Sequence, residues 1–345
     1  GGAAAGRFTG GAVGSTGAVF GGRTERQVDL VDQLLGCVGV LSNLLSGCEE
    51  AKLACVSLQL PLLLQRLWAL SRGAPALARA MLPLIGNYVA HCPPAKCSLT
   101  AYSDSRGRCL ISLIVRAVTG VPHPAAPQMD AELWAMHWRV LQALATAAES
   151  RTVLLRSNCI GAAPALVRRL LSRGERADEA RAAAVVDFMS NLAFNSVGCT
   201  ALLRVPDAFE CLLDALGARH HAPTRYAAAL ALRNVAFSVE GKGAFLAKPR
   251  ALPALVGCLD GGDLQLAALC SGALWALLCR CERAKVAFRR GGILARQLST
   301  AERELTFLTM RPPAAPAARA QLQQALRSLD VVAQLLGLDP TRLKA

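Results

Sequence analysis

The sequence is poor in several residue types that particular folds and chemistries require. Aromatic residues make up 5% of its 345 residues, and there are only five histidines. Val, Ile and Thr, which favour strands, are too scattered to indicate a β-sheet. One of the longest stretches without charge, Leu264 to Cys279, is shorter than the roughly 20 apolar residues of a transmembrane helix. The sequence therefore predicts an all-α protein without a membrane span.

Sequence motifs of common enzyme classes are also absent. There is no GxxxxGK[ST] loop, no HExxH and no GxSxG in the chain. His137 lies between Met136 and Trp138 in a predicted helix, where we expect a core or groove residue rather than a general base. Asp178 and Glu179 are expected at a solvated helix end, where the helix dipole favours carboxylates. We therefore predict no enzymatic activity, no small-molecule substrate and no cofactor.

Thirteen cysteines are spread along the predicted helices, mostly among apolar neighbours. Unpaired cysteine packs as a small hydrophobic residue, and free thiols are typical of reducing compartments. Cys92 and Cys97 lie near His91, and Cys279 and Cys281 form a second pair, but neither group has the CxxC spacing of a structural zinc site. We expect free thiols and no metal site. The start of the chain also lacks a basic segment followed by an apolar core, so we expect no secretory signal and a soluble, intracellular protein.

What the sequence does contain is a repeat of about 43 residues. Asn191-Leu192-Ala193-Phe194 recurs as Asn234-Val235-Ala236-Phe237. Four segments place apolar residues at i, i+3, i+4 and i+7, which is one face of a helix. These are Leu60, Leu63, Leu64 and Leu67; Ala163, Leu166, Val167 and Leu170; Phe209, Leu212, Leu213 and Leu216; and Leu252, Leu255, Val256 and Leu259. Such a repeat predicts an armadillo/HEAT-like α-solenoid of about six degenerate units.

The units are expected to form two stacks. Residues 1–24 are rich in glycine and are predicted to be a flexible, disordered tail. Residues 25–92 are predicted to form the first stack and residues 131–300 the second. Proline-rich breaks indicate that residues 93–130 are an insertion with one helix. A linker and a capping helix are expected in residues 301–345.

A candidate partner-binding groove follows from asparagines near the end of several units. A buried asparagine at a helix end can satisfy local backbone groups, or it can hydrogen-bond the backbone of an extended peptide in an armadillo groove. Both interpretations remain open for Asn87, Asn191 and Asn234, and Trp275 completes the candidate groove. The asparagine row is interrupted near Ala143 and in the unit of Trp275, which argues against a receptor of the nuclear-import type.

The net charge of +14 could favour acidic proteins, nucleic acid or anionic membranes, although a compositional bias of the coding sequence would produce the same pattern. The densest basic cluster lies between residues 280 and 296; it has no series of interleaved aromatic residues that would form a stacking platform for bases, and no recognised nucleic-acid motif. We therefore expect an acidic protein partner rather than nucleic acid.

Several segments resemble the C-terminal armadillo-like region of the rotatin family. They include residues 41–45 (LSNLL), 48–52 (CEEAK), 232–237 (LRNVAF), 252–255 (LPAL) and 271–277 (SGALWAL). The resemblance covers roughly residues 40–300 in collinear order. It implies a non-enzymatic scaffold of centrioles and ciliary basal bodies that binds other centriolar and basal-body proteins.

Such a scaffold acts in centriole and basal-body assembly, ciliogenesis and left–right axis specification. The resemblance thus implies a location in the cytoplasm and cytoskeleton, at the centrosome, centriole and ciliary basal body. The alternative is a cytosolic armadillo adaptor that binds peptides, of the nuclear-import or signalling type.

Overall fold

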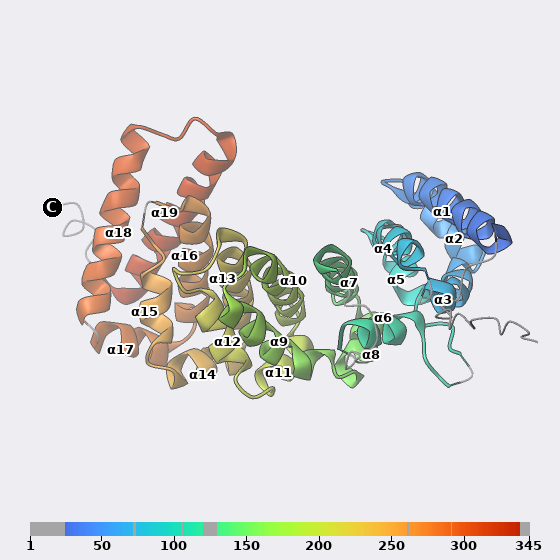
Figure 1. The fold of residues 1–345 in the computed structure, drawn as a ribbon. Coiled ribbons are helices and arrows are strands. Elements are labelled where there is room, and N and C mark those ends of the chain that lie inside the picture. Colours follow the sequence, from blue (N-terminus) through green and yellow to red (C-terminus); the bar gives the residue numbers. More distant parts are fainter. Residues whose placement is uncertain are drawn as a thin grey trace, which may run out of the picture.

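The structure is a computed structural model that describes residues 25–71, 74–104, 106–119, 130–260, 262–290 and 292–338. Every regular element in these ranges is an α-helix, which confirms the predicted fold class (Figure 1). The expected glycine-rich tail, residues 1–24, lies outside the described residues.

The helices follow one another along an elongated array, from α1 at one end to α19 at the other (Figure 1). They are α1 (Glu25–Leu45), α2 (Glu49–Ser57), α3 (Leu60–Ser71), α4 (Pro75–Val89), α5 (Pro93–Ser98), α6 (Leu110–Thr119), α7 (Ala131–Leu144), α8 (Ala148–Arg156), α9 (Cys159–Arg173), α10 (Arg176–Ala193), α11 (Ser196–Leu203), α12 (Ala208–Ala215), α13 (Ala222–Ala236), α14 (Val239–Ala247), α15 (Ala251–Val256), α16 (Leu264–Leu278), α17 (Glu282–Arg290), α18 (Gly292–Met310) and α19 (Pro316–Leu336).

After α1 the helices form triplets, and the third helix of each triplet packs against the third helix of the next. The helices α1, α4, α7, α10, α13, α16 and α19 therefore make a continuous row, which we call the third-helix layer. Figure 1 shows α7, α10 and α13 side by side along one side of the array, with α8, α11 and α14 along the other. The first and second helices also contact their counterparts in the next triplet, as α11 contacts α14 and α9 contacts α12. Each unit is thus covered by its neighbours, as stacked repeats require.

Side-chain caps and glycines set the boundaries of the units. Asp130, Asn195, Ser238 and Asp263 each accept a hydrogen bond from a backbone N–H in the first turn of the following helix. A Cβ added at Gly241 would lie 1.9 Å from the carbonyl oxygen of Val235. Glycine therefore permits α14 to pack closely against the end of α13. Gly198 has the same role between α11 and α10, where an added Cβ would lie 2.3 Å from a backbone oxygen.

The predicted apolar stripes are largely buried, as the solenoid pattern requires. Leu212, Leu213 and Leu216 are at most 4% exposed, and Leu255 is fully buried. The uncharged segment that begins at Leu264 is α16, and most of its residues are buried. Among the described residues, no single helix is both long and apolar enough to cross a membrane. Two helix pairs, bent by 81° and 117°, have the length and composition only when taken together.

The expected division into two stacks is wrong, because residues 93–130 do not interrupt the array. Helix α5 contacts α2 on one side and α8 on the other, and α6 contacts α3 and α9 in the same way. They are the first and second helices of the triplet that α7 completes. Pro93 and Pro94 lie at the start of α5, where the missing N–H of proline has no hydrogen bond to lose. The sequence between α6 and α7, residues 120–129, lies outside the described residues.

The C-terminal boundary also differs from the expectation in part. The predicted boundary at residue 300 falls inside α18, which continues to Met310. The linker is therefore confined to residues 311–315. The expected capping helix is α19, and it packs against α16, α17 and α18.

We predict that Leu212→Asp strongly destabilises the array. Leu212 is fully buried on α12, so the change places a carboxylate in the apolar contact between triplets. The expected loss is about 3–5 kcal/mol in the free energy of unfolding, measured by urea denaturation. Arg290→Ala, on the exposed surface of α17, is the control and should leave the midpoint nearly unchanged. Equal midpoints for the two variants would contradict the assigned stripe.

Candidate partner-binding surface

The candidate asparagines lie in the third-helix layer, and their amide groups connect neighbouring third helices. Asn87 on α4 donates through Nδ2 to the backbone oxygen of Ser42 on α1, at 3.0 Å, and contacts the Ser42 Oγ at 3.1 Å. Asn234 on α13 makes the same pair of contacts with Ser190 on α10, at 3.0 and 3.3 Å. The Nδ2 groups of both side chains are therefore engaged within the array.

Asn191 repeats the arrangement between α10 and α7. Its Nδ2 donates to the backbone oxygen of Gln142 at 3.1 Å. The structure thus brings the three asparagines onto one layer, each at the contact with the preceding third helix. No hydrogen bond to the Oδ1 atoms is made by the described residues, so these acceptors, and one N–H of Asn191, remain open to a peptide. The role of these residues in partner binding stays a prediction.

Basic side chains have a second internal role that the sequence did not reveal. Lys52 on α2 donates from Nζ to the backbone oxygen of Ala90, the C-cap of α4, at 2.7 Å. Lys242 on α14 donates in the same way to Cys279, the C-cap of α16. A cation at this place satisfies an unpaired carbonyl and the negative end of the helix dipole. Part of the positive charge of the chain therefore stabilises helix ends.

Trp275, the fourth predicted residue, belongs to an exposed apolar edge. It is 37% exposed on α16, and its ring meets that of Phe237 edge-on with centroids 5.8 Å apart. Phe194, at the end of α10, is 79% exposed. Val197 and Val239, at the starts of α11 and α14, are also exposed. We call these five residues the apolar edge; it runs along the ends of α10, α13 and α16.

A cavity of about 540 Å³ opens in the third-helix layer between α7, α10 and α13. We call it the central cavity. Ala180, Ala183 and Ala184 of α10 line it, and their short side chains leave room between the neighbouring helices. Arg139 of α7 and Arg176 of α10 are the exposed cations of its lining. No described carboxylate lies within ion-pair distance of either guanidinium.

The central cavity is also lined by two carboxylates, Asp187 and Glu179, whose pKa values are shifted in opposite directions. Burial raises the pKa of Asp187 to about 6, and the charge of Arg139 opposes this shift only in part. Glu179 is only 6% exposed and accepts a hydrogen bond from the backbone N–H of His221 at 2.6 Å. Although its burial acts in the opposite direction, the pKa of Glu179 is lowered by the hydrogen bonds from His221 and His220. The expectation of a solvated helix end at Asp178 and Glu179 is therefore wrong, because Asp178 is also buried, at 2% exposure.

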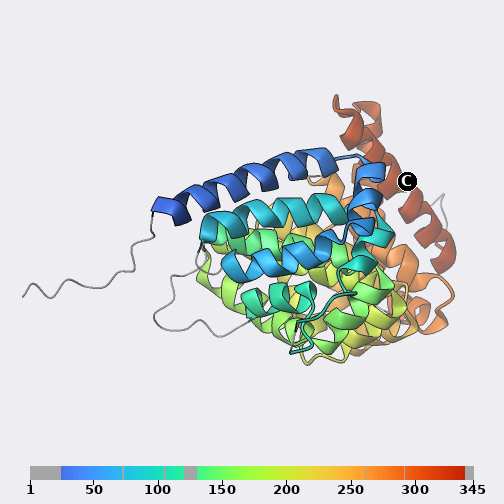
Figure 2. The ribbon, with the colours of Figure 1, turned by 90° about the vertical axis from the view of Figure 1, so that its right-hand side faces the viewer.

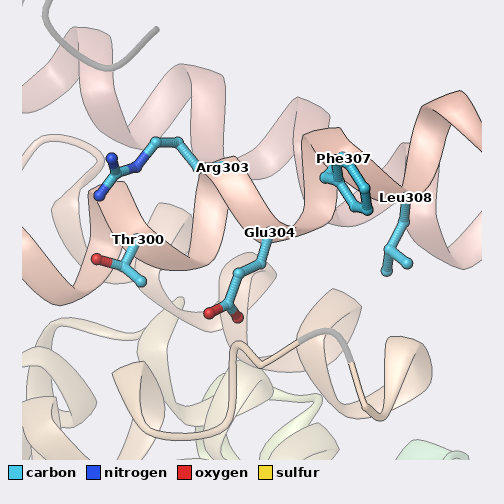
Figure 3. A pocket seen from close by; sticks show the side chains of 5 residues that line it. All are labelled: Thr300, Arg303, Glu304, Phe307 and Leu308. Carbon is cyan, nitrogen blue, oxygen red and sulfur yellow. The ribbon is translucent and has the colours of Figure 1, made fainter. Parts of the chain in front are cut away.

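A second cavity, of about 550 Å³, lies along α18, on the side of the array formed by second helices. Thr300, Arg303, Glu304, Phe307 and Leu308 line it (Figure 3). Its residues come from one helix face and include Phe307, which is 65% exposed. None of the residues predicted from the sequence lies there.

The cysteines and the histidine that were considered for metal binding and catalysis are mostly buried, and the cysteines are unpaired. All thirteen cysteines are unpaired, and burial raises the pKa of Cys159 to about 11 and that of Cys211 to about 12. His137 is 2% exposed, in agreement with the predicted core or groove position, and its Nδ1 lies 2.7 Å from the backbone oxygen of Leu133. Burial lowers its pKa. Among the described residues, no three His, Cys, Asp or Glu side chains are placed to hold a metal ion together.

Comparison with known proteins identifies the architecture. No protein-family model and no curated protein matches the sequence. Among solved structures, a designed armadillo repeat protein in complex with the peptide (KR)4 is 16% identical with a TM-score of 0.57, covering 78% of this chain and 98% of its own. An engineered protein is 17% identical with a TM-score of 0.56, covering 78% of this chain and 97% of its own. The chain therefore has an armadillo-repeat-like solenoid fold.

We predict that Asn234→Ala lowers the free energy of unfolding by about 1–2 kcal/mol, because it removes the bonds from α13 to α10. Asn43→Ala is the matched control. Asn43 is at the equivalent repeat position of α1, but it is exposed and has no preceding third helix among the described residues. Urea denaturation should separate the two variants. An unchanged midpoint for Asn234→Ala would contradict a stabilising role of these hydrogen bonds.

Proposed function

We propose that this chain is a non-enzymatic scaffold that binds acidic segments of partner proteins along its third-helix layer. The observation that supports this most is the central cavity, because it opens in the layer and its exposed charges are the unpaired Arg139 and Arg176. The armadillo-like fold supports a binding role, since stacked repeats present extended surfaces to partners.

The charge pattern favours an acidic partner over a basic one. Of the two carboxylates in the central cavity, Glu179 is buried and already hydrogen-bonded, and Asp187 is half-buried, whereas Arg139 and Arg176 are exposed. The two arginines are therefore the charges that a partner meets. The net charge of +14 would add long-range attraction for acidic segments. A basic peptide, such as the one in the complex of the designed protein, would meet repulsion here.

We also propose that the partners are centriolar and basal-body proteins, and that the chain acts as a rotatin-like scaffold in centriole and basal-body assembly, ciliogenesis and left–right axis specification. The segments that resemble the rotatin family support this, including residues 232–237 and 271–277. The continuous array supports the scaffold role in general, because it offers several units for simultaneous contacts.

The alternative is a cytosolic adaptor that holds a peptide backbone with Asn87, Asn191 and Asn234. The three amide nitrogens already donate to neighbouring helices, which leaves the Oδ1 acceptors and one N–H of Asn191 for the peptide. An adaptor of this kind would therefore depend mainly on peptide N–H groups. We favour the charged surface for this reason.

Peptide binding tests the charge preference. We expect a fluorescent peptide of four Asp-Glu pairs to bind with an affinity that falls as salt rises, and a (KR)4 peptide to bind at least tenfold more weakly. The double variant Arg139→Ala/Arg176→Ala should weaken the acidic peptide by about tenfold, which corresponds to about 1.4 kcal/mol. Fluorescence anisotropy measures both. Arg327→Ala, an exposed arginine on α19 outside the cavity, is the control and should have little effect. Equal affinities for the two peptides would contradict the proposal.

Localisation tests the centriolar role. The chain carrying a fluorescent tag should be enriched at centrosomes of dividing cells and at the bases of cilia. Arg139→Ala/Arg176→Ala should reduce this enrichment if the same surface recruits the partners. A diffuse signal for both the unaltered chain and any longer protein that contains it would count against the proposal, whatever the result of the peptide experiment.

A further inference from the structure

The central cavity crosses α10 obliquely, from α7 at one end to α13 at the other. Figure 2, seen from the α1 end of the array, shows the first two helices of the third-helix layer, α1 and α4, lengthwise and nearly parallel. In such a layer the asparagine hydrogen bonds show which residues lie at the same level. Asn191 of α10 donates to Gln142 of α7, so Arg139, about one turn before Gln142, lies near the level of Asp187. The α7 end of the cavity is therefore level with the second half of α10.

The α13 end of the cavity lies at the start of α10. Thr224, in the first turn of α13, donates from its Oγ1 to the backbone oxygen of Glu179 at 3.2 Å. Arg176, the first residue of α10, and His221, the N-cap of α13, line this end. The cavity thus extends along α10 from Arg176 to Asp187, which are eleven positions or about 16.5 Å apart. This length corresponds to about three turns of a helix.

The floor of the cavity consists of small side chains. Ala180, Ala183 and Ala184 are three and four residues apart, so they lie on one face of α10. Short side chains on a helix face let a second helix approach closely. Helices that pack on one another commonly cross at an oblique angle, with the side chains of one between those of the other. The course and the floor of the cavity therefore suit a helix that crosses α10.

The lining offers few hydrogen-bond partners to the backbone of an extended segment. The three alanines have no polar side-chain atom. The hydroxyl of Thr224, the carboxylate of Glu179 and the backbone oxygen of Gln142 are already hydrogen-bonded within the array. Of the described residues that line the cavity, none is a candidate asparagine. An extended segment would leave backbone N–H and C=O groups unpaired over this floor, whereas a helix pairs these groups internally.

Exposed arginines lie at both ends of the alanine floor. Arg139 lies at the α7 end and Arg176 at the α13 end, and neither has a described carboxylate within ion-pair distance. The charges of the lining therefore favour an occupant with carboxylates at two separate points. Residues eleven positions apart in a helix meet this requirement, because they are about three turns apart and lie on the same face.

We propose that the central cavity binds an acidic α-helix of a partner protein. The helix crosses α10 over Ala180 and Ala184, with one carboxylate at Arg139 and a second, eleven positions away, at Arg176. Small residues between the two carboxylates pack on the alanine floor, as in other complexes of a helix with a groove. The inference rests on the proposed function, because it specifies the conformation of the acidic segment and the spacing of its charges.

Designed peptides test the helical conformation with the full chain. A stapled helical peptide with two glutamates eleven positions apart, and alanines between them on the same face, should bind about tenfold more tightly than the peptide of four Asp-Glu pairs. Moving one glutamate by two positions turns it about 200° around the helix and should weaken binding about tenfold. An unstapled peptide with a central proline, which breaks the helix, should also bind about tenfold more weakly. Fluorescence anisotropy measures all four affinities. Equal binding of the stapled and the proline-containing peptide would overturn the proposal.

Double-mutant cycles test the orientation of the helix. Each glutamate of the stapled peptide is changed to glutamine, and each change is combined with Arg139→Ala or Arg176→Ala. Arg139→Ala should remove the effect of changing one glutamate, and Arg176→Ala should remove the effect of changing the other. Coupling of both arginines to the same glutamate, or to neither, would overturn the proposal.

A substitution in the floor tests the packing independently of charge. Ala180→Phe places a ring in the path of the helix and should weaken the stapled peptide about tenfold. Ala177→Phe is the matched control, because Ala177 is also exposed on α10 but does not line the cavity. Both positions are exposed, so both variants should retain the urea midpoint of the unaltered chain. Unchanged binding by Ala180→Phe would overturn the proposal.

The same titrations separate this inference from the proposed function. If the peptide of four Asp-Glu pairs binds and the stapled helix has no advantage over it, the proposed function stands and the helical partner is wrong. If no acidic peptide binds, both are wrong.

Discussion

Packing of each third helix between its two neighbours is the interaction on which the rest of the structure depends. Helix α10 contacts α7 on one side and α13 on the other, and Val185, Phe188 and Leu192 are fully buried there. No triplet could bury these side chains alone, because its own first and second helices leave one side of the third helix open. The array is therefore stable only as a stack.

Polar groups within the stack serve mainly to complete it. Asn87, Asn191 and Asn234 tie third helices together, while Lys52 and Lys242 complete the C-terminal ends of α4 and α16. Buried polar groups need such partners because an unsatisfied donor or acceptor costs free energy away from water. Asparagines and lysines can suggest a binding site in a sequence, but these five side chains form hydrogen bonds within the array.

The surfaces left for partners are consequently those where this internal pairing stops. Arg139 and Arg176 remain unpaired beside a cavity, and the apolar edge with Phe194 and Trp275 remains exposed along three units. The two surfaces differ in chemistry: the cavity presents charged side chains and the edge presents apolar ones.

The sequence alone determined the helical class, the repeat length and the buried stripes, because apolar periodicity is a local property of each helix. Leu212 could be assigned to the core from its neighbours at i+1 and i+4. Only the tertiary structure decided three other features: the hydrogen-bond partners of the asparagines, the position of the central cavity and the burial of Glu179. Each depends on which backbone carbonyl or side chain of a neighbouring unit comes within hydrogen-bond distance. The same holds for residues 93–130. Proline can lie at the start of a helix or in a break between helices. Only the contacts of α5 and α6 with the units on either side show that the prolines here begin a helix of the array.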